Sequence, residues 1–107
     1  MNLEYQEDVL FVRLGGNLNK FNTYKINKYL VSTIFKNNIK YLVINMDSLE
    51  NIDISGMESL MNAKCAVKMN KGEIYLCFVH NRLKNYLKPL KIKTADNELM
   101  AVELIGA

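Results

Sequence analysis

The sequence predicts an α/β fold, because strand-like and helix-like segments alternate along its 107 residues. Tyr41 to Met46 and Glu73 to Val79 are almost continuously apolar, which is typical of strands that are buried on both faces. Between Thr23 and Lys36, apolar side chains recur at the spacing of an amphipathic helix. The length fits one domain, which we expect to span residues 1–107.

The first elements are expected to form an antiparallel β-hairpin. Asn2 to Gln6 is mixed in polarity, which favours an edge strand, and the side chains of Val9 to Leu14 alternate between two faces. Glu7-Asp8 is a turn signal between these strands, and Gly15-Gly16 is expected to end the second one.

A loop and a second helix are expected after the first buried strand. Residues 47–53 are read as the polar loop. The helix is expected to start at Ser55 or Gly56 and to run to about Met69. Gly72 is suited to a left-handed cap beyond the end of this helix.

The C-terminal quarter of the chain predicts two shorter helices. The first is expected from Asn81 to Lys88, where Pro89 ends it because proline lacks an amide donor. The second is expected from Asn97 to Ile105. The stretch from Lys91 to Thr94 leaves open whether a further strand forms.

Composition and charge exclude several classes of protein. No segment approaches the ~18 consecutive apolar residues of a membrane span, and the N-terminal segment lacks the basic-then-apolar order of a signal peptide. We therefore expect a cytoplasmic location without membrane insertion. The net charge is only +3 and the basic residues are spread along the chain, so we expect no nucleic-acid partner.

The sequence gives little support to an enzyme. It contains no Gly-rich phosphate loop, no Ser-His-Asp order and no paired-cysteine motif. Cys65 and Cys77 have apolar neighbours and are expected to be buried thiols. Together with His80 they cannot complete a four-ligand zinc site. We expect no catalytic residues, no metal and no cofactor.

The hexapeptide Ile52-Asp53-Ile54-Ser55-Gly56-Met57 leads into the second helix, and its serine has two interpretations. Ser55 and Glu58 have the spacing of a capping box, in which each side chain accepts from a free backbone amide. Ser55 is also a candidate phosphorylation site, because a helix N-terminus favours negative charge and a phosphate there would change a surface that a partner contacts.

The two residues before Ser55 leave alternatives open as well. Asp53 either caps the helix start or helps to orient the metal and nucleotide of a kinase. Ile54 is either an exposed apolar contact of the kind found at interface centres or a hydrophobic staple beneath the helix.

The hexapeptide resembles the signature loop of STAS domains, the family of bacterial anti-sigma factor antagonists and of the cytoplasmic tails of sulfate transporters. In the antagonists this loop usually reads Asp-Ser-Ser/Thr/Ala-Gly-Leu. Gly16-Asn17-Leu18-Asn19 resembles the family's Gly-x-Leu/Ile-Asp turn, and Ile44-Asn45-Met46 resembles its Leu-Asp-Leu strand end. The similarity covers residues 1 to about 90.

This resemblance implies a STAS-like mixed sheet of four or five strands with helices packed mainly on one face, and no catalysis by the domain. It also implies that a kinase phosphorylates the first hydroxyl residue after the aspartate. Here that position is Ile54, so the chain is a variant that lacks the usual phosphoacceptor serine. Asn19 and Asn45 stand at two positions that are acidic in the family.

We therefore predict a protein–protein interaction domain of the anti-sigma factor antagonist type, acting in partner switching, signal transduction and transcription regulation. Its expected partner is an anti-sigma factor or serine kinase-like protein. The alternative is a constitutive STAS scaffold of a signalling assembly, or of a transporter complex that would associate it with a membrane. The oligomeric state stays open. The predicted partner-binding residues are Asn19, Asn51, Asp53, Ile54, Ser55, Gly56, Met57 and Glu58.

Overall fold

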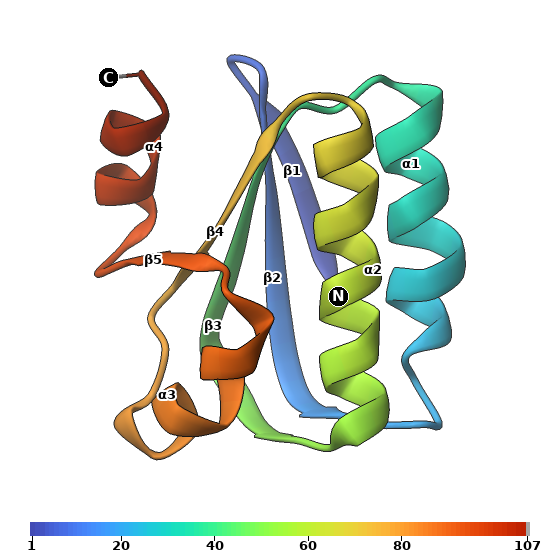
Figure 1. The fold of residues 1–107 in the computed structure, drawn as a ribbon, viewed down its shortest axis with the longest axis vertical. Coiled ribbons are helices and arrows are strands. Elements are labelled where there is room, and N and C mark those ends of the chain that lie inside the picture. Colours follow the sequence, from blue (N-terminus) through green and yellow to red (C-terminus); the bar gives the residue numbers. More distant parts are fainter. Residues whose placement is uncertain (107) are drawn as a thin grey trace.

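Five strands form one mixed β-sheet within residues 1–106, the part of the chain that this computed structural model describes (Figure 1). Ala107, the last residue of the expected domain, lies outside the described residues. The elements in chain order are β1 (Asn2–Gln6), β2 (Val9–Leu18), the π-helix η1 (Lys25–Leu30), α1 (Val31–Lys36), β3 (Tyr41–Ile52), α2 (Ile54–Met69), β4 (Glu73–Cys77), α3 (Asn81–Leu87), the 3-10 helix η2 (Lys88–Leu90), β5 (Lys93–Ala95) and α4 (Glu98–Gly106).

The order of the strands in the sheet follows the chain, from β1 at one edge to β5 at the other. β1 pairs antiparallel with β2, and the remaining neighbours pair in parallel. The predicted hairpin is confirmed, with Gln6 paired to Val9. Glu7 and Asp8 have φ values of 50° and 71°, which is the pattern of a two-residue type I′ turn.

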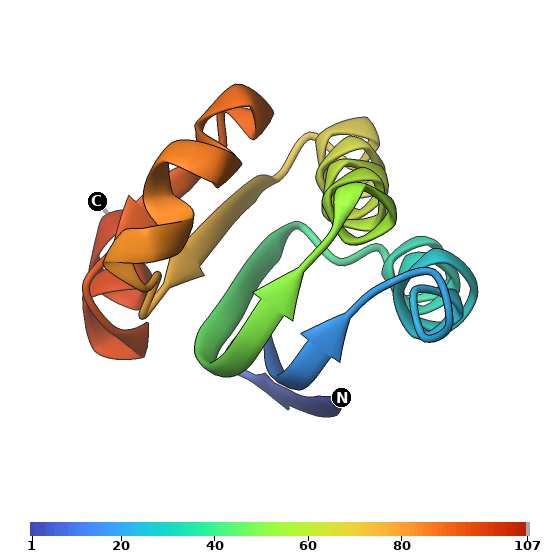
Figure 2. The same ribbon diagram turned by 90° about the horizontal axis from the view of Figure 1, so that it is seen from below.

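The helices lie mainly on one face of the sheet, as predicted (Figure 2). On that face α2, α3 and the helical segment η1–α1 enclose the larger core, whose strand side chains include Val12 and Ile44. α4 covers part of the opposite face, where Ala101 packs with Val43 and Tyr75. None of the helices within residues 1–106 has the length and apolar character that a membrane crossing requires.

β2 and β3 extend further than the sequence predicted. The glycine pair does not end β2, and residues 47–52 are not a loop, because parallel pairing continues to Leu18 opposite Ile52. Two register shifts lie along this extension, and Gly16 has a φ of 68°. Glycine adopts this left-handed conformation without a Cβ penalty, so the glycines accommodate an irregularity in the strand instead of a turn.

The first helix has the predicted apolar stripe but an irregular backbone. Ile26, Leu30 and Ile34 are fully buried, whereas Phe35, an apolar residue of the same helix, is 45% exposed. In η1 the amide of Val31 reaches back five residues to the carbonyl of Ile26, which is the π-helical pattern. The helix ends at Lys36, as the spacing predicted, with Asn37 as its C-cap.

A fifth strand does form near the C-terminus, which settles the question that the sequence left open. β5 pairs in parallel with β4, from Lys93 opposite Tyr75 to Ala95 opposite Cys77. β4 is two residues shorter than predicted, because Phe78 turns away with a φ of 54°. The last helix begins one residue later than predicted, and the Asn97 side chain accepts a hydrogen bond from the Met100 amide at 2.8 Å.

α2 ends in a Schellman motif, but the left-handed residue is not the one predicted. The amide of Gly72 donates to the Val67 carbonyl and the amide of Lys71 donates to the Lys68 carbonyl, both at 2.9 Å. Lys71 has the left-handed φ of 62°, so the assignment of that conformation to Gly72 was wrong. Gly72 is needed for close approach instead, since a Cβ there would lie 1.9 Å from the carbonyl oxygen of Lys40.

We expect Gly72→Ala to lower the free energy of unfolding by about 2 to 3 kcal/mol, because its methyl group would collide with backbone. Urea denaturation measures this loss. Lys71→Gly is the matched control. It relieves a left-handed side chain and should raise stability by up to about 1 kcal/mol. A stable Gly72→Ala variant with a destabilised Lys71→Gly variant would contradict this account of the turn.

Candidate functional site

The loops that follow β2 and β3 lie side by side at one end of the sheet (Figure 1). After the last strand pair, the Asp53 amide donates a hydrogen bond to the Leu18 carbonyl at 3.2 Å. The Asn51 side-chain amide also donates to Asn17 Oδ1 at 3.2 Å. The structure therefore brings the Asn19 turn together with the segment from Asn51 onward.

The Asn19 turn is fixed by its own side chains. Asn19 Oδ1 accepts from the Phe21 amide at 2.9 Å, and Asn22 Oδ1 accepts from the Asn19 amide at 2.8 Å. The side chain of Asn22 also donates to the backbone carbonyl of Asn17. Asn19 thus has a structural role in shaping the turn, and its half-buried side chain contributes only part of its surface to the face.

Asp53, and not Ser55, caps α2. Asp53 has an extended backbone, and its Oδ1 accepts from the Gly56 amide at 2.8 Å. The helix consequently begins at Ile54, and the predicted capping box of Ser55 and Glu58 is wrong. The physical reason is that a carboxylate at this position both accepts from a free amide and interacts favourably with the positive end of the helix dipole.

Because Asp53 is the cap, the hydroxyl of Ser55 is free of that role. It is the second residue of the helix and is half-exposed. Among residues 1–106, no hydrogen bond of its hydroxyl to another group is found. A capping role therefore no longer accounts for this hydroxyl.

Ile54 points outward at the first position of α2. Its side chain is 70% exposed, so the hydrophobic-staple interpretation is wrong and the exposed-contact interpretation remains. An isolated, exposed β-branched residue on a capped helix start presents a rigid apolar surface. Its neighbours Glu58 and Ser55 offer polar groups around it, which is the usual composition of a small interface.

Gly56 and Met57 have mainly structural positions. Gly56 is buried, and a Cβ on it would lie 2.5 Å from the Leu18 carbonyl oxygen and 2.6 Å from Ile52 Cγ1. The glycine therefore allows the helix start to approach the end of β2. Met57 is half-buried against the larger core. Gly56 is therefore the one buried residue among the predicted binding residues, and Met57 offers only part of its surface to a partner.

Two exposed aromatic residues beside this face were not predicted from the sequence. Phe21 is 77% exposed in the loop after Asn19, and Tyr24 is 51% exposed where η1 begins. Their exposure could have been predicted, because both residues lie off the apolar stripe of the first helix and have polar neighbours on either side.

On the opposite face of the sheet, an ion-pair network attaches α4. Arg13 donates to both carboxylate oxygens of Glu98 at 2.9 and 2.8 Å, and to Glu4 at 2.7 Å. Asn45 donates to Glu98 at 2.9 Å. Hydrogen bonds from Arg13, and then from Asn45, outweigh partial burial and lower the pKa of Glu98 below its ordinary value. No local pattern in the sequence indicates this long-range pairing.

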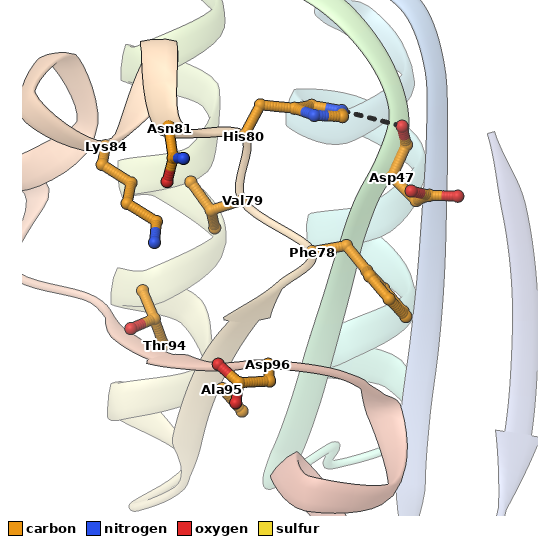
Figure 3. A pocket seen from close by; sticks show the side chains of 9 residues that line it. All are labelled: Asp47, Phe78, Val79, His80, Asn81, Lys84, Thr94, Ala95 and Asp96. Carbon is orange, nitrogen blue, oxygen red and sulfur yellow. Dashed lines mark hydrogen bonds between the residues drawn. The ribbon is translucent and has the colours of Figure 1, made fainter.

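An open pocket of about 370 Å³ lies beyond the carboxyl end of β4 (Figure 3). His80 Nε2 lies 2.9 Å from the backbone oxygen of Asp47, which fixes the ring against β3. Lys84 and Asp96 give the remaining lining a mixed charge. Within residues 1–106, no group of three or more His, Cys, Asp or Glu side chains is arranged to hold a metal ion.

The two cysteines differ in exposure. Cys77 is buried as predicted, and burial, followed by the nearby Glu98 charge, raises the pKa of its thiol to about 12. Cys65 was predicted to be buried but is exposed, because it lies on the solvent side of α2. Both are free thiols.

The fold and the sequence match known proteins. The sequence model of the STAS domain matches residues 1–95. The fold is similar to the anti-sigma factor antagonist SpoIIAA in its unphosphorylated form, with a TM-score of 0.83 and 17% identity over 99% of this chain and 97% of that chain. It is also similar to RsbS from Moorella thermoacetica, with a TM-score of 0.84 and 16% identity over 98% of this chain and 93% of that chain.

A third similarity is to part of a much longer protein. The murine anion transporter Slc26a9 matches with a TM-score of 0.79 and 13% identity over 96% of this chain, but over only 18% of the transporter chain. The match of the family model to most of the sequence shows that the chain belongs to the STAS domain family. The solved structures show that its fold is the one found in anti-sigma factor antagonists and in this transporter.

Replacing Asp53 with Ala is expected to lower the free energy of unfolding by about 1 kcal/mol, because the Gly56 amide loses its acceptor. Ser55→Ala and Glu58→Ala should each change it by less than about 0.5 kcal/mol. Thermal or urea unfolding of the three variants measures these differences. If Ser55→Ala lowered the free energy of unfolding as much as Asp53→Ala does, the capping-box interpretation of Ser55 would be supported instead.

Glu98→Gln is expected to lower the free energy of unfolding by about 1 to 2 kcal/mol at neutral pH, because Arg13 loses a charged partner but stays partly exposed. The folded-state pKa of Glu98 is lowered. Its contribution is therefore complete above the unfolded pKa of about 4.3 and is lost as the pH falls through the lower folded-state pKa.

Urea unfolding of the wild type and of Glu98→Gln, at neutral pH and at roughly pH 2.5, tests this dependence. The gap between the two proteins should shrink in acid. Glu103→Gln, on an exposed residue of the same helix, is the control and should differ from the wild type by less than about 0.5 kcal/mol at both pH values. If the difference in free energy of unfolding between the wild type and Glu98→Gln were the same at both pH values, the ion pair would not be the cause of that difference.

Proposed function

We propose that this chain is a regulatory binding domain of the anti-sigma factor antagonist type, which binds an anti-sigma factor or serine kinase-like protein. Its binding residues are proposed to be those at the end of β2 and at the start of α2. The proposal rests on membership of the STAS family together with the fold that the chain shares with SpoIIAA and RsbS. It implies a role in partner switching, and hence in transcription regulation, in the cytoplasm.

The observation that carries the proposal is the exposure of Ile54. A β-branched apolar side chain is 70% exposed at a helix start that Asp53 and Gly56 hold in place. Burying such a side chain against a partner removes apolar surface from water. Because the helix start is already ordered, little conformational entropy is lost when the partner binds.

We also propose that binding is not controlled by phosphorylation at the usual position. Ile54 has no hydroxyl group to accept a phosphate. Ser55 is the remaining candidate, since its half-exposed hydroxyl is not the helix cap. A phosphate on Ser55 would lie in the first turn of α2, where the helix dipole favours negative charge, so modification would alter the binding face without unfolding the domain.

The second candidate function is a constitutive scaffold module. The missing phosphoacceptor at Ile54 favours it, because a module without this switch would bind its partner permanently. The similarity to part of the transporter Slc26a9 supports a version in which the partner is a membrane transporter. In that version the chain would be associated with a membrane only through its partner.

The test is the binding of Ile54→Asp to purified anti-sigma kinase-like proteins from the same genome, measured by calorimetry. We expect affinity to fall about tenfold or more, because an apolar contact is replaced by a charge. Thermal unfolding should change little, since the side chain is exposed and an acidic residue suits a helix N-terminus.

Met69→Asp is the matched control, because Met69 is 73% exposed at the opposite end of the same helix. It should lose a little stability and keep its affinity. Equal affinities for wild type and Ile54→Asp would overturn the assigned face. Intact mass after incubation with kinase and ATP then separates the two candidates, since a phosphate on Ser55 supports a switch and an unmodified, bound protein supports the scaffold.

A further inference from the structure

One side of the candidate face is strongly basic and carries exposed aromatic rings. None of the eleven acidic residues of the chain lies between residues 9 and 46, whereas five lysines and Arg13 do. Arg13 is paired with Glu98 and Glu4 on the opposite face of the sheet. We call the group on η1 and on the loop before it the basic aromatic face. It consists of Lys20, Phe21, Tyr24, Lys25, Lys28 and Tyr29.

Two of the three lysines of this face contact aromatic rings, and none of the three is paired with a carboxylate within residues 1–106. Lys20 Nζ lies 5.2 Å from the ring centroid of Phe21, and Lys28 Nζ lies 5.9 Å from that of Tyr29. The rings of Tyr24 and Tyr29 meet edge to face, with centroids 6.1 Å apart. No ion pair to these lysines is found within residues 1–106, in contrast to Lys68 and Lys93, which share Glu73.

The exposure of the three rings points to contact with another molecule. Phe21, Tyr24 and Tyr29 are 77%, 51% and 55% exposed. Exposed aromatic residues with unpaired cations beside them are the composition that protein interfaces favour, with rings at the centre and charges at the rim. Tyr29 is carried by η1 and Tyr24 directly precedes it, and π-helical stretches occur frequently at functional sites.

We propose that the basic aromatic face binds an acidic surface of the protein partner that contacts Ile54. This inference rests on the proposed function, because Phe21 belongs to the Asn19 turn and the two surfaces are therefore continuous. The three lysines of this face have no acidic neighbour in sequence and create a local positive potential, which attracts an acidic partner and accelerates its association. The rings then supply the apolar contact area.

The charge distribution favours a protein over an anionic membrane. The neighbouring side of the same end of the molecule carries Glu50, Asp53 and Glu58, of which Glu50 and Glu58 are exposed. A flat anionic bilayer that reached Ile54 would approach these carboxylates together with the lysines, and the repulsion would offset the attraction. A protein surface can place acidic groups against η1 and other groups against the start of α2.

The first experiment compares two double variants with the same net charge. Lys25→Glu/Lys28→Glu alters the basic aromatic face, and Lys84→Glu/Lys88→Glu alters exposed lysines near α3. With the kinase-like protein that binds the wild type, the first variant should lose about tenfold or more in affinity at low salt, and the loss should shrink as salt rises. The second should stay within about twofold. Equal losses in both variants would overturn the proposal.

Failure of this inference is separable from failure of the proposed function. If Ile54→Asp weakens binding but Lys25→Glu/Lys28→Glu does not, the basic aromatic face is wrong and the proposed function stands. If no kinase-like protein binds the wild type, the proposed function fails. A titration with poly-L-glutamate, monitored by the NMR shifts of the backbone amides, then tests independently whether the basic aromatic face binds acidic groups.

In that titration the largest shift changes should lie at residues 20–29, and the Lys25→Glu/Lys28→Glu variant should abolish them. Shift changes as large at residues 84–93 would overturn the proposal, because they would show that any lysine cluster suffices. Vesicles of phosphatidylglycerol supply the last arm. If the wild type bound these vesicles and Lys25→Glu/Lys28→Glu did not, the face would be a membrane-binding surface. The proposal of an acidic protein partner would then be overturned.

Discussion

The candidate face depends on the parallel pairing of β2 with β3 beyond the glycine pair of β2. This pairing continues to Leu18 opposite Ile52, and the Asp53 amide then donates to the Leu18 carbonyl. The first turn of α2 is thereby placed against the end of β2, and Gly56 leaves the space that this contact requires. Without the extension, the two loops would leave the sheet at different heights and would form no common surface.

The same contacts make the face rigid before any partner arrives. Asp53 satisfies the Gly56 amide, and the side chains of Asn19 and Asn22 satisfy amides of the preceding turn. The partner that we propose for this face would therefore meet an ordered surface, and little conformational entropy would be lost on binding. This is also why Ile54 stays exposed: its backbone is fixed as the first residue of a capped helix, and its side chain cannot fold back onto the core.

Apart from β5, the sequence predicted the order of the elements because each of them carries a local signal, such as the apolar run from Tyr41 to Met46. It predicted wrongly where the signal depended on tertiary contacts. The Gly15-Gly16 pair reads locally as a turn, but pairing with β3 keeps it in the strand. Ser55 has good capping chemistry, but the Asp53 amide bonds to the Leu18 carbonyl at the end of the strand pairing, and Asp53 becomes the N-cap two residues earlier. The bidentate pair of Arg13 with Glu98 joins residues 85 positions apart, so no local pattern contains it.

The neutral residues at two acidic family positions fit this chain's own neighbours. Asn45 donates a hydrogen bond to Glu98, which Arg13 holds against the sheet. An aspartate at position 45 would place a second carboxylate beside Glu98 and oppose the docking of α4. Asn19 similarly leaves the adjacent Lys20 without an acidic neighbour. Asn45 therefore stabilises α4 on one face of the sheet, and Asn19 keeps the loop before η1 positive at the end where we propose that a partner binds.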